Sequence, residues 1–186
     1  MEVNHLNLHQ DIIDACKMGD RKAQYKLYKL YSKAMYNICY RIANDAEDAE
    51  DILQESFVSA FRNLHTYRGE SSFGAWLKKV VVNRAINHVK KKRLEIQPMT
   101  ANFEYEDESD YNTNEDLSWN IEQIKSAVQE LPQGYRIVFS LYLLEGYDHG
   151  EIAGILNISE STSKSQYNRA KKKLKEIIKN KAFHAG

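Results

Sequence analysis

Apolar side chains recur every three or four residues through most of the chain, which is the spacing of one face of an α-helix. In the N-terminal half this repeat is interrupted at Gly19 and across a polar loop, residues 65–72. We expect helices over residues 8–18, 20–43, 45–64 and 73–93. Asp20, Asp45 and Ser72 stand where an N-cap side chain accepts hydrogen bonds from the first free backbone N–H groups.

The same repeat returns in the last third of the chain and ends in a different arrangement. One helix ends near Leu131, and Pro132 opens the next at its first turn. A short helix then begins at Asp148, a turn follows at residues 157–158, and a long helix begins near Glu160. A short helix, a turn and a long helix in this order are typical of a helix-turn-helix.

Between these two helical parts, residues 95–117 show no apolar repeat and carry acids without a compensating cation. Seven of these acids gather after Phe103, namely Glu104, Glu106, Asp107, Glu108, Asp110, Glu115 and Asp116. Like charges repel along such a segment, so we expect a flexible acidic linker. It serves either as an inert tether or as a functional acidic segment. The chain then divides into a first unit, residues 1–94, this linker, and a second unit, residues 118–186.

Composition supports an all-α protein, because only two prolines and eight glycines occur in 186 residues and no stretch reads as strand. Cys16 and Cys39 lie outside any C-x-x-C pair or Cys/His array, which predicts reduced thiols and neither a metal nor a cofactor site. We find no apolar run typical of a signal peptide or a membrane span, and we expect a cytoplasmic protein.

The formal net charge is zero, but the charges are segregated along the chain. The helix expected over residues 45–64 has an apolar stripe opposite an acidic stripe of Asp48, Asp51 and Glu55. Acidic side chains in the first turns of a helix are stabilised by the positive end of its dipole, so a solvated, well-capped surface helix is one interpretation. The acidic face nevertheless contrasts with the rest of the chain, whose other surfaces suit nucleic acid.

The helix expected over residues 73–93 combines aromatic, amide and basic side chains beside the polar loop. Lys79, Asn83 and Asn87 line a face away from the apolar stripe, and residues 90–93 end the helix with a cationic cluster. Bases need stacking surfaces and phosphates need positive charge, so this combination suits single-stranded nucleic acid. A buried helix whose basic end complements the dipole is the alternative.

The long helix that begins near Glu160 has two contrasting faces. Its inward side is expected to hold Ser163, Tyr167, Ala170, Leu174 and Ile177. Its outward side is expected to hold Ser161, Lys164, Ser165, Asn168, Arg169 and Lys172. The outward side chains near the start of the helix can donate and accept hydrogen bonds, and those further along are cations. This arrangement suits a helix that reads base edges while it holds phosphates. A basic, solvated helix is the alternative.

Taken in order, these segments resemble the sigma-70 family of bacterial RNA polymerase sigma factors, in its extracytoplasmic-function (ECF) group. The region 2 signature D-A-E-D-x-x-Q-E-x-F fits residues 48–51 and continues through Gln54, Glu55 and Phe57. The segment FGAWLKKVVVNRAINHVKKKR is similar to the part of that family that opens and reads the minus-10 promoter element. The segment LPQGYRIVFSLYLLEGYDHGEIAGILNISESTSKSQYNRAKKKL is similar to region 4, which reads the minus-35 element.

The resemblance implies a region 2 bundle over residues 1–94 and a region 4 helix-turn-helix over residues 118–186, joined by the linker at residues 95–117. It implies a sigma factor that binds core RNA polymerase and directs promoter-specific transcription initiation, with no catalytic site, cofactor or small-molecule substrate. The expected partners are core polymerase and promoter DNA, both as duplex and as melted non-template strand. An anti-sigma factor is a further candidate partner, because such proteins often hold this group inactive.

The positions that match the family's motifs take on its residue roles as expectations. Polymerase docking is expected of Asp48, Asp51, Gln54 and Glu55. Minus-10 DNA binding is expected of Tyr67, Arg68, Ser72, Trp76, Lys79, Asn83 and Asn87, with a flipped base received by the loop. Minus-35 DNA binding is expected of Thr162, Lys164, Ser165, Asn168, Arg169 and Lys171. Gln166 departs from the family, since many relatives carry arginine there.

Two other functions fit parts of the sequence. A stand-alone DNA-binding regulator needs only the helix-turn-helix, and tight, specific duplex binding without polymerase would favour it. An enzyme acting on nucleic acid has little support, because no clustered carboxylates, metal ligands or nucleophile motif appears where the basic residues converge.

Overall fold

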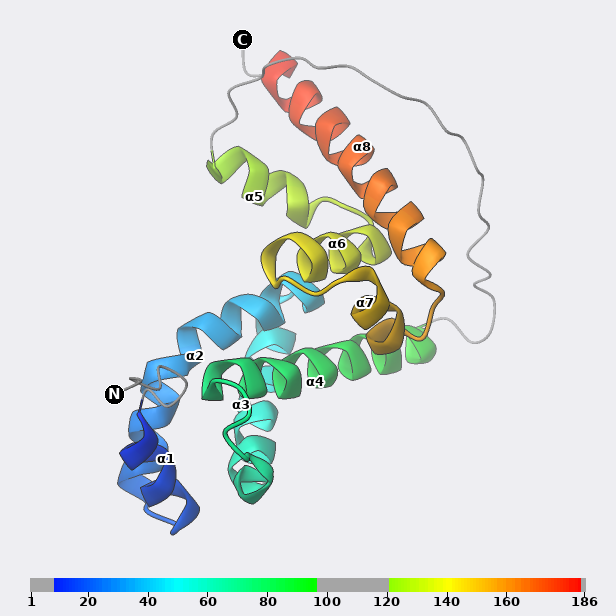
Figure 1. Cartoon of the computed structure of the whole chain (residues 1–186). Coiled ribbons are helices and arrows are strands. Elements are labelled where there is room, and N and C mark those ends of the chain that lie inside the picture. Colours follow the sequence, from blue (N-terminus) through cyan, green and yellow to red (C-terminus); the bar gives the residue numbers. More distant parts are fainter. Residues whose placement is uncertain (1–8, 97–120, 185–186) are drawn as a thin grey trace, which may run out of the picture.

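The computed structural model describes residues 9–96 and 121–184, and every regular element within these ranges is helical (Figure 1). The first unit contains α1 (Gln10–Lys17), α2 (Arg21–Ala43), α3 (Ala46–Arg62), the 3₁₀ turn η2 (Leu64–Thr66) and α4 (Phe73–Ile96). The second unit contains α5 (Ile121–Gln129), α6 (Gln133–Phe139), the π-helical turn η3 (Ser140–Leu144), α7 (His149–Leu156) and α8 (Glu160–His184). The expected all-α fold with two helical parts is confirmed.

Side-chain caps fix where the helices of the first unit begin. Asp20 Oδ1 accepts a hydrogen bond from the backbone N–H of Lys22 at 2.7 Å, and Asp45 Oδ1 accepts one from Asp48 at 2.9 Å. Ser72 Oγ accepts one from Ala75 at 3.3 Å. The caps therefore lie where the sequence places them.

One helix end differs from expectation, because α4 runs to Ile96 instead of stopping near residue 93. Neither glycine nor proline occurs between Arg93 and Pro98, so nothing in the sequence stops the helix at residue 93. The linker expected over residues 95–117 otherwise lies outside the described residues, and its flexibility stays a prediction.

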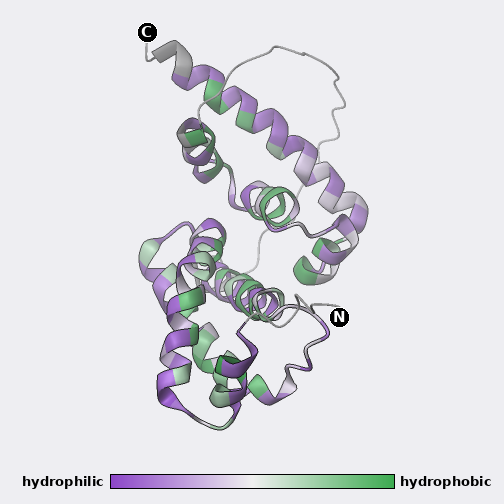
Figure 2. Ribbon diagram, turned by 60° about the vertical axis from the view of Figure 1, so that its left-hand side comes forward, coloured by the Kyte–Doolittle hydropathy of each residue, from purple (hydrophilic) through white to green (hydrophobic). Residues whose placement is uncertain are grey.

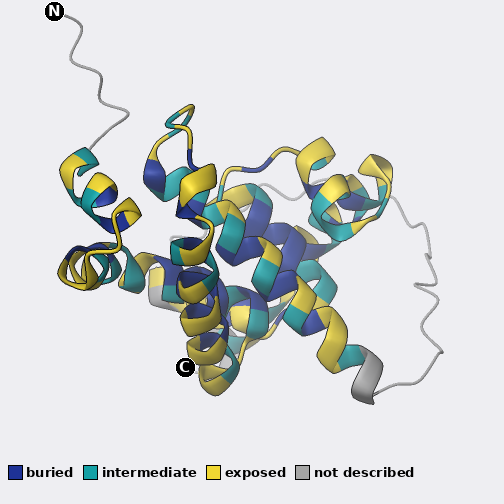
Figure 3. Cartoon of the chain, turned by 90° about the horizontal axis from the view of Figure 1, so that it is seen from below, coloured by how far each residue is buried: buried dark blue, intermediate teal, exposed yellow. Residues whose placement is uncertain are grey.

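The core of the first unit forms where α2, α3 and α4 pack together, with α1 covering one end. Its largest fully buried side chains include Leu27, Ile42, Ile52, Leu77 and Val81, none more than 1% exposed. In Figure 3 the buried residues gather at the centre of the molecule and the exposed ones at its rim. Burying an apolar side chain of this size contributes about 1.5–3 kcal/mol, so the bundle is held mainly by this core.

The second unit has a smaller core between α5, α6 and α8. Its buried members are Ala127, Val128, Leu131, Phe139, Ala170, Leu174 and Ile178. The rest of α8 is hydrophilic along most of its length, as Figure 2 shows in purple. The helix is therefore held along one stripe and leaves a long polar surface.

The two units also pack against each other, which the sequence did not predict. Ile137 and Val138 of α6, Leu141 of η3 and Ile152 of α7 belong to the first unit's core rather than the second's. In Figure 1, α6 lies against α2 and α7 lies against α4. The second unit is thus docked on the first through α6, η3 and α7.

Candidate polymerase and nucleic-acid interfaces

The acidic stripe of α3 lies on the surface of the first unit, opposite the side that enters the core. Leu53 and Phe57 are buried, at 6% and 3% exposure, and Gln54 and Glu55 between them face outward. Asp51, Gln54 and Glu55 all have exposed side chains. The structure thus brings three of the four predicted docking residues together on one open face.

A shallow hollow borders this face between α3 and α4. It is lined by Gln54, Glu55, Val58, Ser59, Arg62, Asn63 and Arg84. Glu55 Oε2 lies 3.3 Å from Arg84 Nη1, and Val58 is 49% exposed beside them. Interfaces combine apolar contact with polar groups at the rim, so the hollow offers a partner protein both.

Asp48, the fourth predicted docking residue, lies in a different environment. Its Oδ1 is 3.1 Å from His88 Nε2 and its Oδ2 is 2.5 Å from Lys92 Nζ, both on α4. Only 18% of its side chain is exposed. The hydrogen bond from Lys92 is the largest cause that lowers the pKa of Asp48 below its usual value of 3.8. Asp48 therefore ties α3 to α4 as well as belonging to the signature.

The polar loop before α4 is anchored by Tyr67. This residue is 3% exposed, its OH donates to the carbonyl oxygen of Ser71 at 2.8 Å, and burial raises its pKa. Its ring packs against Phe73 and Trp76, with ring centroids 5.6 Å away in both cases. Arg68 is exposed. The Tyr67 side chain thus holds the loop from within, and its contact with DNA stays a prediction.

One face of α4 carries the other predicted minus-10 residues. Lys79, Asn83 and Asn87 are exposed and follow one another at four-residue intervals, and Trp76 begins the row half-buried. Ser72, at the start of the helix, is exposed as well. The row presents one indole, one cation and two amides, the groups that stack on bases and bond to base edges and phosphates.

The helix-turn-helix is built as the sequence predicts. Asp148 and Glu151 form a capping box, with Asp148 Oδ1 accepting from the Glu151 backbone at 2.7 Å and Glu151 Oε2 from the Asp148 backbone at 3.0 Å. Asn157 takes the left-handed conformation that ends α7, with φ +59°. Ser159 Oγ accepts from the backbone N–H of Thr162 at 3.0 Å and so caps α8.

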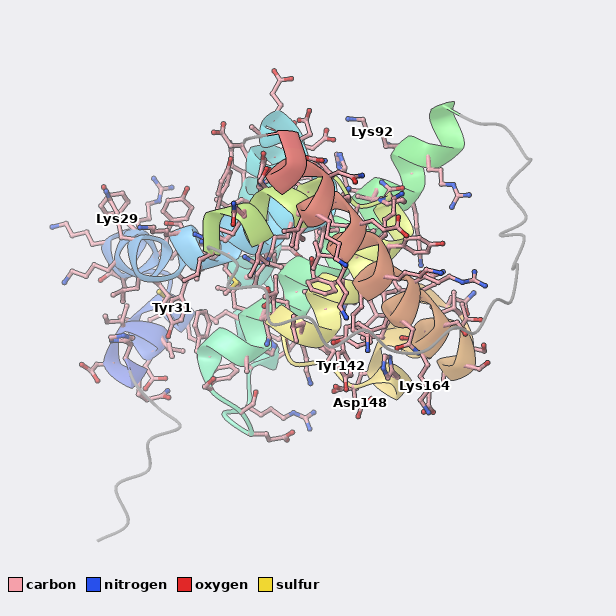
Figure 4. All side chains as sticks on the ribbon, turned by 90° about the horizontal axis from the view of Figure 1, so that it is seen from above. Lys29, Tyr31, Lys92, Tyr142, Asp148 and Lys164 are labelled. Carbon is pink, nitrogen blue, oxygen red and sulfur yellow. The ribbon has the colours of Figure 1, made fainter. Side chains whose placement is uncertain are left out.

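The outward face of α8 holds the predicted minus-35 residues. Lys164 and Asn168 are exposed, and Lys164 Nζ lies 2.6 Å from Glu160 Oε1. Ser165 and Arg169 are half-buried, while Lys171 is exposed with its Nζ 4.9 Å from the ring centroid of Tyr167. In Figure 4, Lys164 and Asp148 are labelled toward the lower edge of the view, away from Lys29 at the left.

Comparison with known proteins identifies the two units. Residues 27–95 match the family described as sigma-70 region 2, and residues 121–174 match the family described as sigma-70, region 4. An ECF RNA polymerase sigma-E factor of Salmonella typhimurium is 30% identical over 182 residues, covering 92% of this chain and 93% of that protein. The chain belongs to the sigma-70 family, in its ECF group. The ECF sigma factor SigM of Bacillus subtilis is 30% identical over 155 residues, covering 82% of this chain and 93% of that protein.

Two solved structures share the fold of this sigma factor. The sigma factor RpoE of Bartonella quintana, in complex with the anti-sigma factor NepR, has a TM-score of 0.56 at 21% identity over 83% of this chain and 96% of that one. CnrH, in complex with the cytosolic domain of CnrY, has a TM-score of 0.54 at 20% identity over 92% of this chain and 97% of that one. The region 2 match holds α3, the loop and α4, and the region 4 match holds the helix-turn-helix.

Several residues that position these surfaces of the sigma factor were not found from the sequence. His88 and Lys92 hold Asp48, and their four-residue spacing on α4 was a usable signal. His149 stacks on Tyr142 with ring centroids 4.3 Å apart, and its Nδ1 lies 2.9 Å from Ser163 Oγ, which ties α7 to α8. No local pattern marks this contact.

The described parts of the sigma factor contain no group of three or more potential metal ligands. Burial raises the pKa of Cys16 to about 11 and that of Cys39 to about 12, so both thiols are protonated near neutral pH. None of the described helices has the length and apolar character that crossing a bilayer requires.

Proposed function

We propose that this sigma factor uses three separate surfaces: the exposed acidic face of α3 for core RNA polymerase, the α4 row for the minus-10 element, and α8 for the minus-35 element. The observation that carries the proposal is the separation of charge. Acids gather on α3, whereas the polar, aromatic and cationic groups that suit nucleic acid gather on α4 and α8. One protein partner and one DNA partner can then be held at the same time.

The docking role of α3 is supported by its open geometry. Asp51, Gln54 and Glu55 are exposed and lie beside the hollow that contains Val58. A carboxylate surface is repelled by DNA phosphates, so this face is available to polymerase while DNA is bound elsewhere. We propose that Asp48 contributes indirectly, by fixing α3 against α4.

The minus-10 role is supported by the α4 row and the exposed part of the preceding loop. Trp76 offers a ring for stacking, Lys79 a cation for phosphate, and Asn83 and Asn87 donors and acceptors for base edges. Arg68 and Ser72 are exposed next to the row, in the loop proposed to receive a flipped base.

The minus-35 role is supported by the first turns of α8. Lys164, Ser165, Asn168 and Arg169 lie on its outward side, in the positions from which a recognition helix reaches the major groove. Thr162 and Lys171 flank them and are proposed to contact phosphates. We propose no catalytic role for the chain, an anti-sigma factor as its regulator, and the cytoplasm as its place of action.

Reconstituted transcription tests this function directly. The purified chain and core RNA polymerase, with genomic fragments of the source organism as template, should give discrete, promoter-dependent transcripts. The matched control omits only this chain. Identical transcripts in the two reactions would refute the function, and tight sequence-specific duplex binding by the chain alone would favour a stand-alone regulator instead.

A further inference from the structure

Helix α2 carries a row of cations that none of the three proposed surfaces uses. Its 23 residues include six cations and neither aspartate nor glutamate. Four of the cations, Lys22, Lys26, Lys29 and Lys33, follow one another at intervals of three or four residues and so form one stripe along the helix, the lysine stripe. The formal net charge of the chain is zero, so this stripe is a local excess of positive charge.

The lysine stripe lies on the side of α2 that faces away from the core. Ala23, Leu27 and Met35 of the same helix are buried, whereas all four lysines are exposed. At 100° per residue the four lysines fall within an arc of about 60°, opposite these buried positions. In Figure 4, Lys29 is labelled at the left edge of the view, and most of the molecule lies to its right. The stripe is therefore open to a partner.

The positive charge of the lysine stripe is not compensated within the protein. Among residues 9–96 and 121–184, none of the four lysines forms an ion pair. Acids border the stripe at its two ends, because Asp20 caps the helix beside Lys22 and Glu50 of α3 shares a hollow with Lys33. Lys26 and Lys29 lie in the middle, between these acids, and are the charges that a negatively charged partner would neutralise.

Exposed apolar side chains flank the lysine stripe. Tyr25 and Leu30, at 61% and 48% exposure, lie on either side of it, and Met18, at 88%, comes just before the start of α2. Cations beside exposed aliphatic and aromatic groups are typical of protein surfaces that rest on a membrane, where phosphates attract the cations and the apolar groups reach the acyl boundary. Tyrosine in particular is enriched at that boundary.

A nucleic acid fits the same surface less well. Single strands are held in positively charged grooves with open aromatic rings, whereas the lysine stripe lies on the outer side of one helix. Lys29 Nζ is 5.6 Å from the ring centroid of Tyr25, so one face of this ring is already covered. The four stripe positions also lack the amides that Asn83 and Asn87 contribute to the α4 row. Leu30 offers nothing to a phosphate.

We propose that the lysine stripe, with Tyr25 and Leu30 beside it, docks this sigma factor on the anionic surface of a lipid bilayer. Headgroup phosphates hold the ammonium groups, and the flanking side chains reach the acyl boundary without crossing the membrane. Lys22 and Lys33 are ~17 Å apart along the helix, so all four lysines can meet one flat surface. Each lysine near an anionic membrane strengthens binding by about 5-fold.

Sedimentation of the full chain with lipid vesicles tests the proposal. Vesicles of phosphatidylglycerol and phosphatidylcholine in equal parts should bind the protein, and raised ionic strength should release it. Vesicles of phosphatidylcholine alone should not bind it. Lys26→Gln with Lys29→Gln should weaken binding by ~25-fold, and Leu30→Ser by ~3-fold, with circular dichroism as the check on folding. Equal binding to both kinds of vesicle, or undiminished binding by the double lysine variant, would overturn the proposal.

The matched control comes from α8, which is also basic. Lys173→Gln with Lys175→Gln removes the same two charges from exposed positions on that helix. This control should bind the anionic vesicles as the wild type does. An equal loss in the α2 and α8 variants would show that total charge, and not the lysine stripe, attracts the protein to the membrane, and the proposal would then fail.

Titration with random-sequence DNA, single-stranded and duplex, separates a membrane surface from a nucleic-acid surface. The α2 variant Lys26→Gln with Lys29→Gln should bind both DNAs as the wild type does, and it should support the same reconstituted transcription. A larger loss of DNA binding than of vesicle binding, or a loss of transcription, would assign the lysine stripe to promoter or polymerase instead and overturn the proposal. Absence of transcription with the wild type would refute the proposed function, while vesicle binding still decides on the stripe.

Discussion

Two acidic residues, Asp48 and Glu145, each bind two basic side chains, but Asp48 does so within the first unit and Glu145 between the two units. Asp48 lies at the surface of the first unit, and both of its carboxylate oxygens are paired, with His88 and Lys92. Glu145 lies between the units with 8% of its side chain exposed, and its carboxylate pairs with the guanidinium of Arg41 on α2. Its backbone carbonyl accepts a hydrogen bond from Lys78 Nζ on α4 at 2.6 Å, and the Nε of Arg41 is buried without a hydrogen-bond partner among the described residues. The first cluster is a brace within one unit, and the second joins the two units.

This difference matters because burial changes the energetics of an ion pair. An exposed pair typically contributes about 0–1 kcal/mol, whereas removing one partner of a buried pair leaves a charge that is costly to bury. Breaking the Asp48 cluster should therefore change little, and breaking the Glu145 cluster should change both stability and the arrangement of the units.

The largest expected effect is on core polymerase binding, where Asp48 should behave differently from the rest of the acidic face. Asp51→Lys together with Glu55→Lys should weaken core polymerase binding by at least ~100-fold, or about 2.8 kcal/mol, because both side chains are exposed on the proposed docking face. Asp48→Asn should weaken it by less than ~3-fold. Binding is measured by titration of polymerase, and circular dichroism checks folding. Equal losses in both variants would show that Asp48 docks directly.

The next effect concerns the buried partner of Glu145. Arg41→Ala should lower the free energy of unfolding by about 2 kcal/mol, because the mostly buried carboxylate of Glu145 loses its cation. Urea denaturation measures this loss. Adding Glu145→Ala to the variant should recover part of it, since no unpaired carboxylate remains. A loss below about 0.5 kcal/mol for Arg41→Ala would contradict the buried character of the pair.

A smaller effect tests whether the packing of α7 requires its backbone to approach α4 closely. A Cβ at Gly154 would meet no atom within 4 Å, and Gly154 lies inside α7 without a positive φ. Gly154→Ala should therefore raise the free energy of unfolding by about 0.5–1 kcal/mol through helix propensity alone. Thermal unfolding measures the gain. Destabilisation instead would mean that the helix must approach α4 more closely than the structure shows.

The smallest effect belongs to the Asp48 brace. Asp48→Asn should lower the free energy of unfolding by about 0.5 kcal/mol at pH 7. Because the folded pKa of Asp48 is lowered, its contribution is complete above the unfolded value of 3.8 and disappears as the pH falls through the lower folded pKa. Urea denaturation at pH 7 and at pH 3 should show the difference between the proteins shrinking. A constant difference at both values would assign it to packing rather than charge.

Local signals in the sequence predicted most of the fold. Caps at Asp20, Asp45 and Asp148 and apolar stripes with helical spacing are determined by residues within a few positions of each other. The same periodicity separates the exposed row of Lys79, Asn83 and Asn87 from the buried side of α4, so the composition of that surface was predictable too.

Contacts between distant segments could not be predicted in this way. Arg41 and Glu145 are 104 residues apart, and Lys92 is 44 residues from Asp48, so no spacing rule connects them. The Tyr67 side chain points into the core because the loop brings its ring against Phe73 and Trp76. The composition of the loop does not reveal this contact. Gln166, seen in the sequence only as a departure from relatives, is 5% exposed and lines the groove between the units.

The π-helical turn η3 makes the contact between the two units sensitive to chain length. In this turn the N–H of Glu145 bonds to the carbonyl of Ser140, five residues back, at 3.0 Å. Deleting one residue there would restore α-helical spacing and rotate everything that follows by about 100°. Glu145 would then swing away from Arg41, although none of the residues proposed to contact DNA or polymerase had changed. The loss of a single residue in η3 would therefore disrupt the contact between the units and leave the composition of the proposed binding surfaces intact.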